Sequence, residues 1–474
     1  MKHTKWRFEV FSFFDYTGIA KHLSKMAEKG WMIEKIANTG WVYRKIEPQK
    51  LTFFVSYFPK ASDFDPGPTE AQQMFHDFCG HTGWKLAVTA AQMQVFYNEQ
   101  ENPVPIETDP LLQIETIHAA AKKSFLPAHI FILLLGIING FLCVLTWSSR
   151  PVQILANSAN LFSGFAWIML IAAVFIELGS YFLWRAKAKR LAAQDEFART
   201  YSCSGIRLFI LAAVLAGYVY WLADMLWNGS PLWKAIAVFV ILFSAGLFLF
   251  VNGLKHFLQR RNVSRNMNRL ITVISCIVVS QAVMGAVTFF FLHASQKGLF
   301  DGGLETYEHN GTEFSIYQDE LPLTVEDLLG TARDGYVREH TGSESMLAAY
   351  YEMRQYPRYD LKDISNMPGL SYSVTEIRLP CLYEFCKNSL LNGPQDETED
   401  GRTVYIHHFE PADPAPWQAL DAYQIRWNGG MLDRYLLCYE SRIIDICFDW
   451  KPTKEQMAVT AEKLSGQSSI FPVK

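Results

Sequence analysis

The sequence lacks the short motifs that mark common catalytic sites. Its 474 residues contain no glycine-rich phosphate loop, no HExxH, no GxSxG and no CxxC. Cysteine is also scarce, at eight residues, and no set of four metal-ligating side chains is evident. We therefore expect a protein without enzymatic activity, and we assign no catalytic residue, no metal site and no cofactor.

Neither sign of charge dominates the chain. The 43 Lys and Arg residues nearly balance the 47 Asp and Glu residues, the formal net charge is −4, and neither end carries a long basic run. The broad positive surface typical of nucleic-acid-binding proteins is therefore missing. We expect no direct contact with nucleic acid.

An apolar segment is also missing from the N-terminal region. The opening MKHTKWRFEV mixes charged and aromatic residues, and the first apolar stretch begins near Phe125. A secretory signal peptide would place its apolar part within about the first 30 residues. We expect the N-terminal zone to stay in the cytoplasm.

The middle of the chain is strongly apolar, although the mean hydropathy of the whole sequence is only +0.04. Crossing about 30 Å of hydrocarbon takes about 20 helical residues. Five stretches qualify, at residues 125–147, 161–184, 206–227, 233–254 and 270–292. The sequence predicts an all-α transmembrane bundle of about five helices over 125–292. An amphipathic linker helix at 111–124 precedes it, and α+β soluble domains at 1–110 and 295–474 flank it.

Positive charge in the short connections predicts the orientation. Two connections are poor in basic residues, and the other three are rich in them. The basic ones contain Lys122, Lys123, Arg185, Lys187, Lys189, Arg190, Arg199, Lys255, Arg260, Arg261, Arg265 and Arg269. Because basic connections stay in the cytoplasm, we expect the N-terminal domain inside and the C-terminal domain outside the cell. The alternative is that one apolar stretch is a buried helix of a soluble domain, which would return the C-terminal domain to the cytoplasm.

The first 110 residues contain an internal repeat. Each half has a strand, a helix, a Gly-Trp pair that opens a second strand, and a third strand. The helices are expected at residues 15–28 and 69–79, and the pairs are Gly30-Trp31 and Gly83-Trp84. A duplicated β-α-β-β unit predicts an antiparallel sheet with its helices packed on one face.

Several fragments of this repeat resemble a known family. MAEKGW (residues 26–31), YRKIEP (43–48), FVSYF (54–58), Gly83-Trp84 and PIETD (105–109) together resemble the bacterial DUF2812 family. The resemblance implies a domain of unassigned activity, often attached to membrane spans in Gram-positive bacteria and encoded beside PadR-type transcription regulators. It brings no catalytic residue with it.

Aromatic side chains are abundant in the same zone. Trp31, Trp41 and Trp84 are candidates for lining a pocket that binds a flat apolar ligand. The alternative is that these rings form the core of a small sheet domain, where aromatic residues supply much of the buried area.

The C-terminal zone mixes strand and helix patterns and contains four cysteines. They are Cys381, Cys386, Cys438 and Cys447. Outside the cell, a long-range disulfide between a helix and a hairpin is permitted. Buried free thiols are the alternative.

Glu177 is the most informative ionisable residue, because it lies inside the second predicted span. A carboxylate at that depth costs about 3 kcal/mol unless it is paired or protonated. His129 of the first span reaches a similar depth, so we predict Glu177 and His129 as a coupling pair. The alternative is that Glu177 only fixes helix packing.

Three classes of function fit these observations. The two-sided layout and the family resemblance favour a non-enzymatic membrane signalling protein that relays an envelope or ligand signal to a cytoplasmic partner, with a PadR-type regulator as the candidate. One alternative is a transporter or efflux accessory subunit, for which homo-oligomers would supply further helices. Another is an envelope enzyme with its site in the external domain.

Terminal tags on the full-length chain test the orientation. We expect a tag after Lys474 to react with an impermeant reagent on intact cells, and a tag before Met1 to react only after permeabilisation. The reason is that the basic connections hold the N-terminal side in the cytoplasm. A C-terminal tag reachable only from the cell interior would contradict the two-sided layout.

Overall fold

The computed structural model describes residues 4–37, 39–201, 203–228, 231–296, 305–330, 335–361, 367–392, 396–399, 402–427 and 430–466. The chain divides into two compact units. One unit contains Met1–Gly140 and Phe165–Phe289, and the other contains Phe141–Gly164 and Phe290–Lys474. The C-terminal domain therefore shares its unit with the connection between the first two spans, and the N-terminal domain shares its unit with most of the other helical residues.

The N-terminal domain repeats one order of elements twice, as predicted. The first half consists of β1 (Thr4–Arg7), α1 (Tyr16–Glu28), β2 (Trp31–Ala37) and β3 (Gly40–Lys45), and the second of β4 (Thr52–Tyr57), α2 (Glu70–His81), β5 (Lys85–Ala90) and β6 (Met93–Asn98). Both helices begin at a side-chain cap. The Asp15 carboxylate accepts from the Gly18 amide, and the Thr69 hydroxyl accepts from the Gln72 amide.

Backbone details repeat as well. Gly30 and Gly83 have positive φ angles of 78° and 85°, which let the chain turn sharply from helix into strand. Shortly after each glycine the strand pairing contains a bulge, between Ile33 and Lys35 and between Leu86 and Val88. The two halves therefore share one backbone design.

The strands form two sheets where the sequence predicts a single one. Each sheet is antiparallel with three strands, in the orders β1–β3–β2 and β4–β6–β5. In β4, Phe53 packs in the core that contains α1, whereas Phe54 packs with Trp84 and Phe96 in the cluster that contains Cys79 of α2. Because successive strand residues point to opposite faces, α1 and α2 cover opposite faces of the second sheet. The expectation that both helices share one face is therefore wrong.

Among the described residues, five helices are long and apolar enough to cross a membrane, as predicted. They are α4 (Phe125–Ser149), α6 (Ser158–Ala192), α7 (Ser204–Asn228), α8 (Pro231–Arg260) and α9 (Arg265–Gln296), with the linker α3 (Pro110–Lys123) before them and the short α5 (Pro151–Leu155) between α4 and α6. Large apolar side chains cover their surfaces, such as Leu183, which is 75% exposed. Surfaces of this kind are typical of helices that lie in the hydrocarbon of a bilayer.

Two glycines bring the first two spans close together. Gly136 and Gly140 lie about one turn apart on α4, and both face Ile171 of α6. A Cβ atom at Gly136 would lie 2.8 Å from Ile171 Cγ1, which is closer than ordinary contacts allow. Small residues at this spacing permit close helix packing in membranes.

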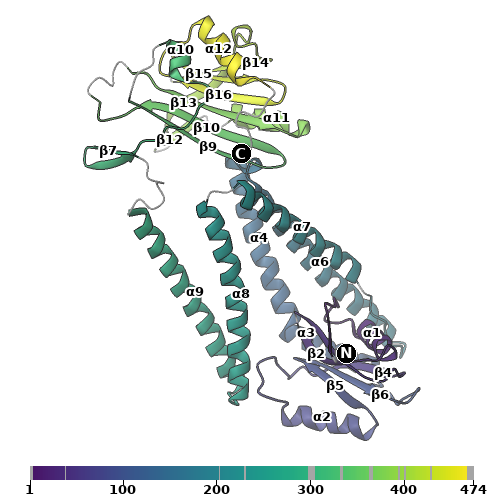
Figure 1. Ribbon diagram of the computed structural model, residues 1–474. Coiled ribbons are helices and arrows are strands. Elements are labelled where there is room, and N and C mark those ends of the chain that lie inside the picture. The colour runs from purple at the N-terminus through teal and green to yellow at the C-terminus, as the bar shows by residue number, and fades with distance from the viewer. Residues whose placement is uncertain are drawn as a thin grey trace. The chain divides into compact units, whose positions relative to one another are not determined.

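The C-terminal domain is built on an antiparallel sheet of eight strands, in the order β12–β13–β14–β15–β16–β11–β10–β9 (Figure 1). The strands are β9 (Tyr336–Glu344), β10 (Ala348–Pro357), β11 (Leu370–Ile377), β12 (Asp396–Glu399), β13 (Arg402–Ala412), β14 (Asp421–Trp427), β15 (Gly430–Cys438) and β16 (Arg442–Phe448). A separate hairpin consists of β7 (Thr306–His309) and β8 (Thr312–Ser315). Sheets are thus present on both sides of the apolar helices in the sequence, as expected.

Helices cover parts of both faces of the eight-stranded sheet. On one face, α10 (Val325–Leu329) and α12 (Lys454–Leu464) bury Met353 and Ile446. On the other face, α5 and α11 (Tyr383–Leu391) cover one end, where Cys386 and Cys438 are buried. All eight cysteines, which lie within the described residues, are free thiols. The disulfide considered from the sequence is therefore not formed in this structure.

Replacing Gly30 with alanine tests the turn from α1 into β2. The alanine would have to adopt a φ of +78°, and its Cβ atom would lie 2.8 Å from the Ile46 carbonyl oxygen. We expect a loss of about 1–3 kcal/mol in the stability of the N-terminal domain. It should lower the thermal unfolding midpoint of the full-length protein in detergent. Gly67→Ala is the matched control, since nothing lies within 4 Å of its Cβ position. Equal effects of the two substitutions would contradict strain at Gly30.

Candidate functional site

An aromatic cluster joins the N-terminal domain to the first two spans. Phe14, just before α1, is 1% exposed. Its ring stacks on Trp184 of α6 with 5.3 Å between centroids and meets Tyr181 at 5.5 Å. Phe13 stacks on Phe125, at the start of α4, at 5.6 Å. Burial of several rings in one cluster contributes on the order of several kcal/mol, so it fixes the domain to the helices.

Polar contacts beside this cluster hold the start of α1 against the segment that follows α6. The Thr200 amide donates to Thr17 Oγ1 at 3.1 Å, and the Thr200 hydroxyl donates to Asp15 Oδ1. The Tyr16 hydroxyl donates to the Ala198 carbonyl oxygen. Because Asp15 Oδ1 also accepts from the Gly18 amide, one oxygen both caps α1 and binds the segment that follows α6.

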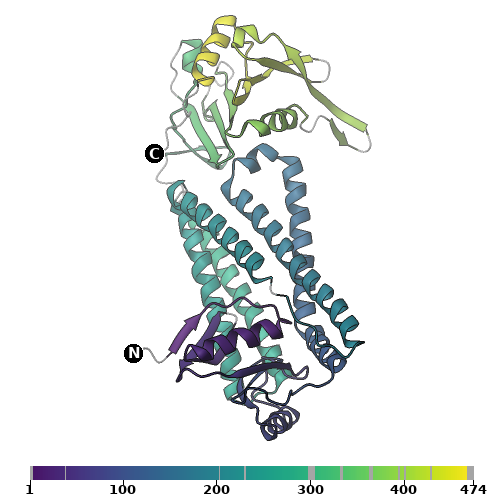
Figure 2. The same cartoon turned by 90° about the vertical axis from the view of Figure 1, so that its right-hand side faces the viewer.

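A second attachment joins the loop after β4 to the connection between α8 and α9. Arg265 donates through Nε and Nη2 to the two carboxylate oxygens of Asp65, at 2.6 and 2.8 Å. Gln259 donates to the Asp63 carbonyl oxygen at 2.8 Å, and the buried Asn268 donates to the Phe64 carbonyl oxygen at 3.2 Å. A bidentate pair of this kind fixes geometry as well as charge. Figures 1 and 2 show the N-terminal domain, in purple, beside the helix ends where α8 stops and α9 begins.

Glu177, singled out from the sequence, is buried in α6 and pairs with Arg207 in the first turn of α7. The distance from Glu177 Oε2 to Arg207 Nη1 is 3.5 Å. His129 instead contacts the Phe125 carbonyl oxygen through Nδ1 at 2.8 Å and packs on the Phe125 ring. Among the described residues, the predicted pair of Glu177 and His129 is therefore not formed. A guanidinium stays charged at every physiological pH, whereas an imidazole does not, so arginine is the stronger partner for a buried carboxylate. The sequence feature that could have pointed to this partner was Arg207, a basic residue inside the third predicted span, 206–227.

The three predicted pocket tryptophans do not surround one cavity. Trp41 is buried and stacks on Phe11 at 5.3 Å. Trp84 belongs to the separate cluster beneath α2, and its indole N–H donates to the Val104 carbonyl oxygen at 2.8 Å. Trp31 is partly buried against the main core. Trp41 and Trp84 thus act as core residues of different sheets.

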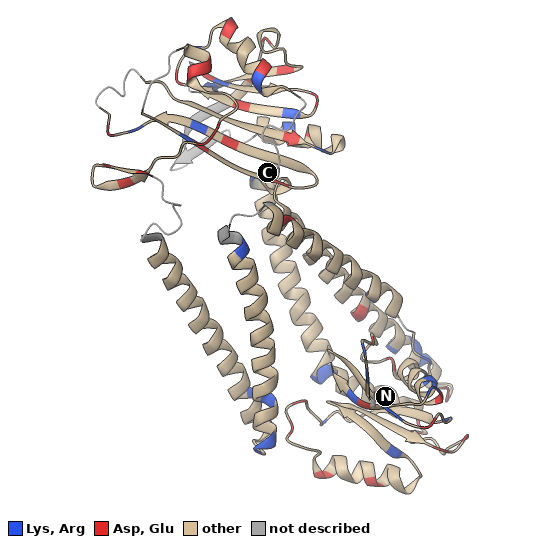
Figure 3. Ribbon diagram, viewed as in Figure 1, with Lys and Arg blue, Asp and Glu red and all other residues tan. Residues whose placement is uncertain are grey.

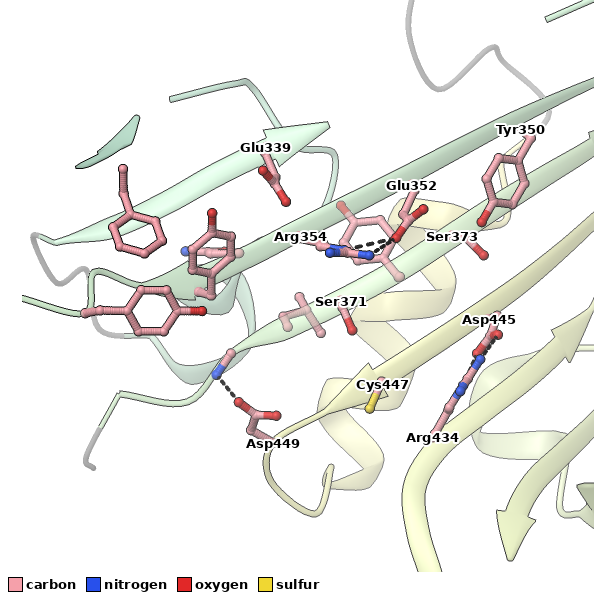
Figure 4. A pocket seen from close by; sticks show the side chains of 17 residues that line it. Glu339, Tyr350, Glu352, Arg354, Ser371, Ser373, Arg434, Asp445, Cys447 and Asp449 are labelled. Carbon is pink, nitrogen blue, oxygen red and sulfur yellow. Dashed lines mark hydrogen bonds and ion pairs between the residues drawn. The ribbon is translucent and has the colours of Figure 1, made fainter. Parts of the chain in front are cut away.

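A trough of about 670 Å³ lies on the face of the eight-stranded sheet opposite α10 and α12 (Figure 4). Two ion pairs border its floor. Arg354 and Glu352 pair along β10, and Arg434 of β15 donates to both carboxylate oxygens of Asp445 of β16, at 2.8 and 2.6 Å. Between the two pairs the strands carry the small side chains Ser371, Ser373 and Cys447.

Aromatic rings form one wall of the trough. The ring of Tyr359 lies 6.0 Å from that of Tyr356 and 5.7 Å from that of Phe314. Burial, followed by the nearby charge of Glu339, raises the pKa of Tyr356 to about 12. Sequence reasoning missed the trough, because its residues come from strands that are distant in the sequence and carry no motif.

Most of the repeat belongs to a stretch shared with other proteins. Residues 15–129 match the DUF2812 family model. The family is described as a protein of unknown function, and the match confirms the resemblance seen in the sequence. It runs from the cap residue Asp15 to His129 of α4, so the DUF2812 domain includes α3 and the start of the first span. No curated protein and no solved structure gives a significant match to the chain.

Two carboxyl groups of the DUF2812 domain lie in surroundings that disfavour their charge. Burial raises the pKa of Asp15, although the hydrogen bond from Thr200 and the charge of Arg207 oppose the rise. Burial likewise raises the pKa of Glu107, against a hydrogen bond from Ser56. In mildly acidic solution the folded domain therefore binds protons at these groups more tightly than the unfolded chain.

The stability contributed by these two groups should rise as the pH falls from neutral toward their ordinary pKa values of 3.8 and 4.5. In that window the folded chain takes up the protons first, so proton binding favours folding. We expect Asp15→Asn combined with Glu107→Gln to reduce the change in the thermal unfolding midpoint of the full-length protein between about pH 7 and pH 5. The exposed Asp77→Asn is the control. If the double variant kept the pH dependence of the wild type, burial of these carboxyl groups would not govern it.

Proposed function

We propose that the chain is a non-enzymatic membrane signalling protein. The DUF2812 domain lies in the cytoplasm, the eight-stranded domain lies outside the cell, and the helices relay an envelope or ligand signal between them. The receiver is a cytoplasmic partner, and a PadR-type transcription regulator is the candidate that the family resemblance suggests.

The double attachment of the DUF2812 domain carries this proposal. One attachment reaches the segment after α6 through Thr200, and the other reaches the connection between α8 and α9 through Arg265. A domain fixed at two points has to rotate or deform when those helices move relative to each other. Movement among the spans is thereby converted into a change in the DUF2812 domain.

Charge supports the cytoplasmic placement of the DUF2812 domain. Lys and Arg residues gather at the helix ends beside it, shown in blue in Figure 3. Lys189 and Arg190 stand in the last turn of α6, and Arg260 stands in the last turn of α8. Cytoplasmic connections carry an excess of such residues. Five spans then lead to a C-terminal domain outside the cell.

The C-terminal domain in turn holds the connection between α4 and α6. Val152, Leu155 and Ala156 of this connection are buried in a cluster with Leu436 of the eight-stranded sheet. The Ser345 hydroxyl donates to the Leu155 carbonyl oxygen at 2.6 Å. Both α4 and α6 run from one unit into the other. A structural change in the C-terminal domain therefore has a direct covalent path to the DUF2812 domain.

An exposed apolar surface on α2 supports the existence of a cytoplasmic partner. Met74 and Phe78 lie one turn apart and are 66% and 61% exposed. Large apolar side chains that stay exposed together are typical of interaction surfaces. This surface lies in the DUF2812 domain and outside both attachments.

Transcript profiling in the natural host tests the relay. It compares the wild type, a deletion of the gene, and an attachment variant that carries both Thr200→Val and Arg265→Gln. We expect the attachment variant to insert and accumulate normally. It should nevertheless change the same transcripts as the deletion, because both attachments of the DUF2812 domain are weakened. A variant with Met74→Ser and Phe78→Ser should have the same effect, through loss of the partner.

Thr312→Val, at an exposed position of β8, is the matched control and should leave the transcripts unchanged. Two outcomes would contradict the proposed function. One is a deletion that alters no transcripts. The other is an attachment variant with the transcripts of the wild type, although the deletion changes them.

A further inference from the structure

The floor of the trough in the eight-stranded sheet is a regular array of side chains. Strand pairing places Arg354, Ser371, Cys447 and Arg434 in one row across β10, β11, β16 and β15. Neighbouring strands lie about 4.8 Å apart, so the two arginines at the ends of this row stand roughly 14 Å apart at the backbone. The small residues between them leave an open channel that is wide enough for a small molecule.

The channel has more negative than positive charge. Both arginines are already neutralised, Arg354 by Glu352 and Arg434 by Asp445. Two further carboxylates line the trough. Glu339 stands opposite Arg354 on β9, and Asp449 follows β16 and accepts from the Gly369 amide at 2.7 Å. Among the described residues, the lining contains no lysine, and its charged side chains give a net charge of about −2 toward a ligand with positive charge.

The aromatic wall is suited to the same kind of ligand. Tyr356, Tyr359 and Phe314 present their rings to the trough, and Tyr359 is 44% exposed. One cation of the chain already lies on this ring cluster: the Arg358 guanidinium, which pairs with Asp360, is 5.0 Å from the centre of the Tyr307 ring, which stacks on Phe314. Aromatic faces beside carboxylates are a common arrangement for binding alkylated ammonium groups.

We propose that this trough is a binding site for a small organic cation, of the quaternary or alkylated ammonium class. The cationic group sits against Tyr356 and Tyr359 with Glu339 beside it, and the rest of the ligand extends along the channel toward Asp449. The volume of about 670 Å³ lies in the range of small-molecule pockets and leaves room for such a ligand. The site goes beyond the proposed relay, and its occupancy can be measured whether or not a signal crosses the membrane.

Titration of the full-length protein with choline tests the site directly. The protein is kept in a maltoside detergent, which has no choline headgroup, and binding is followed by calorimetry or by saturation-transfer NMR. The comparison ligand is 3,3-dimethylbutan-1-ol, which has the same shape without the charge. We expect saturable binding of choline and none of the alcohol. Raised salt should weaken the binding, because the carboxylates are partly exposed.

Substitutions in the lining separate this site from other sites on the protein. We expect Glu339→Gln combined with Asp449→Asn to weaken choline binding about tenfold, and Tyr359→Leu to weaken it several-fold. The matched controls are Glu462→Gln on α12, at the opposite face of the sheet, and Phe385→Leu on α11, both at exposed positions. Neither control should alter the affinity.

An unchanged thermal unfolding midpoint verifies that each variant is folded, and the single substitution Glu339→Gln replaces the double variant if that one unfolds. Three results would overturn the assignment. They are no saturable binding of choline to the wild type, equal binding of the uncharged alcohol, and affinities that the lining substitutions leave unchanged.

Discussion

The contact between Phe14 and Trp184 is the interaction on which the attachment of the DUF2812 domain to α6 depends. It brings a soluble domain and a span of the membrane region into one compact unit. Once these rings are stacked, the start of α1 lies where Thr200 can reach both Asp15 and Thr17. The stack and these hydrogen bonds together hold the cap residue of α1 against the segment that follows α6.

Buried charge is concentrated at the same place. Asp15 and Glu177 are both buried carboxylates, and Arg207 is a cation that affects both. Its guanidinium lies 3.5 Å from Glu177, and its charge lowers the pKa of Asp15 against the effect of burial. Such interactions are stronger in a medium of low dielectric constant than in water. A shift of α7 would therefore change the electrostatic interaction of Arg207 with both carboxylates. This supports an attachment of the DUF2812 domain that responds to movement of the helices.

Local patterns explain what the sequence predicted correctly. The five spans follow from apolar length, and the two halves of the DUF2812 domain follow from strand and helix periodicity. The turns at Gly30 and Gly83 are also local, since each depends on a few neighbouring residues. The separation into two sheets was not predictable in this way. Hydrogen-bonding partners among β-strands are chosen across the whole domain, and no local signal stops a sheet after three strands.

The functional residues were predictable only where one residue stood out from its surroundings. Glu177 did so as a carboxylate in an apolar stretch. Its depth in the predicted span suggested His129 as the partner, whereas the packing of the helices places Arg207 beside it. The trough offered no such signal, because Glu339, Arg354 and Asp445 are ordinary residues of three separate strands until strand pairing brings them to one face of the sheet. The tryptophans were conspicuous in the sequence, yet Trp41 and Trp84 are buried in different cores.

Hydrogen exchange of the full-length protein tests most directly whether the aromatic cluster holds the DUF2812 domain on the helices. The amides of residues 12–18 are compared in the wild type, in Trp184→Ala, and in Leu183→Ala, which alters an exposed residue of the same helix. A docked domain predicts slow exchange in the wild type and in Leu183→Ala, and much faster exchange in Trp184→Ala, because loss of the ring opens the aromatic cluster. Fast exchange in the wild type, or equal exchange in all three proteins, would contradict a DUF2812 domain held by this contact.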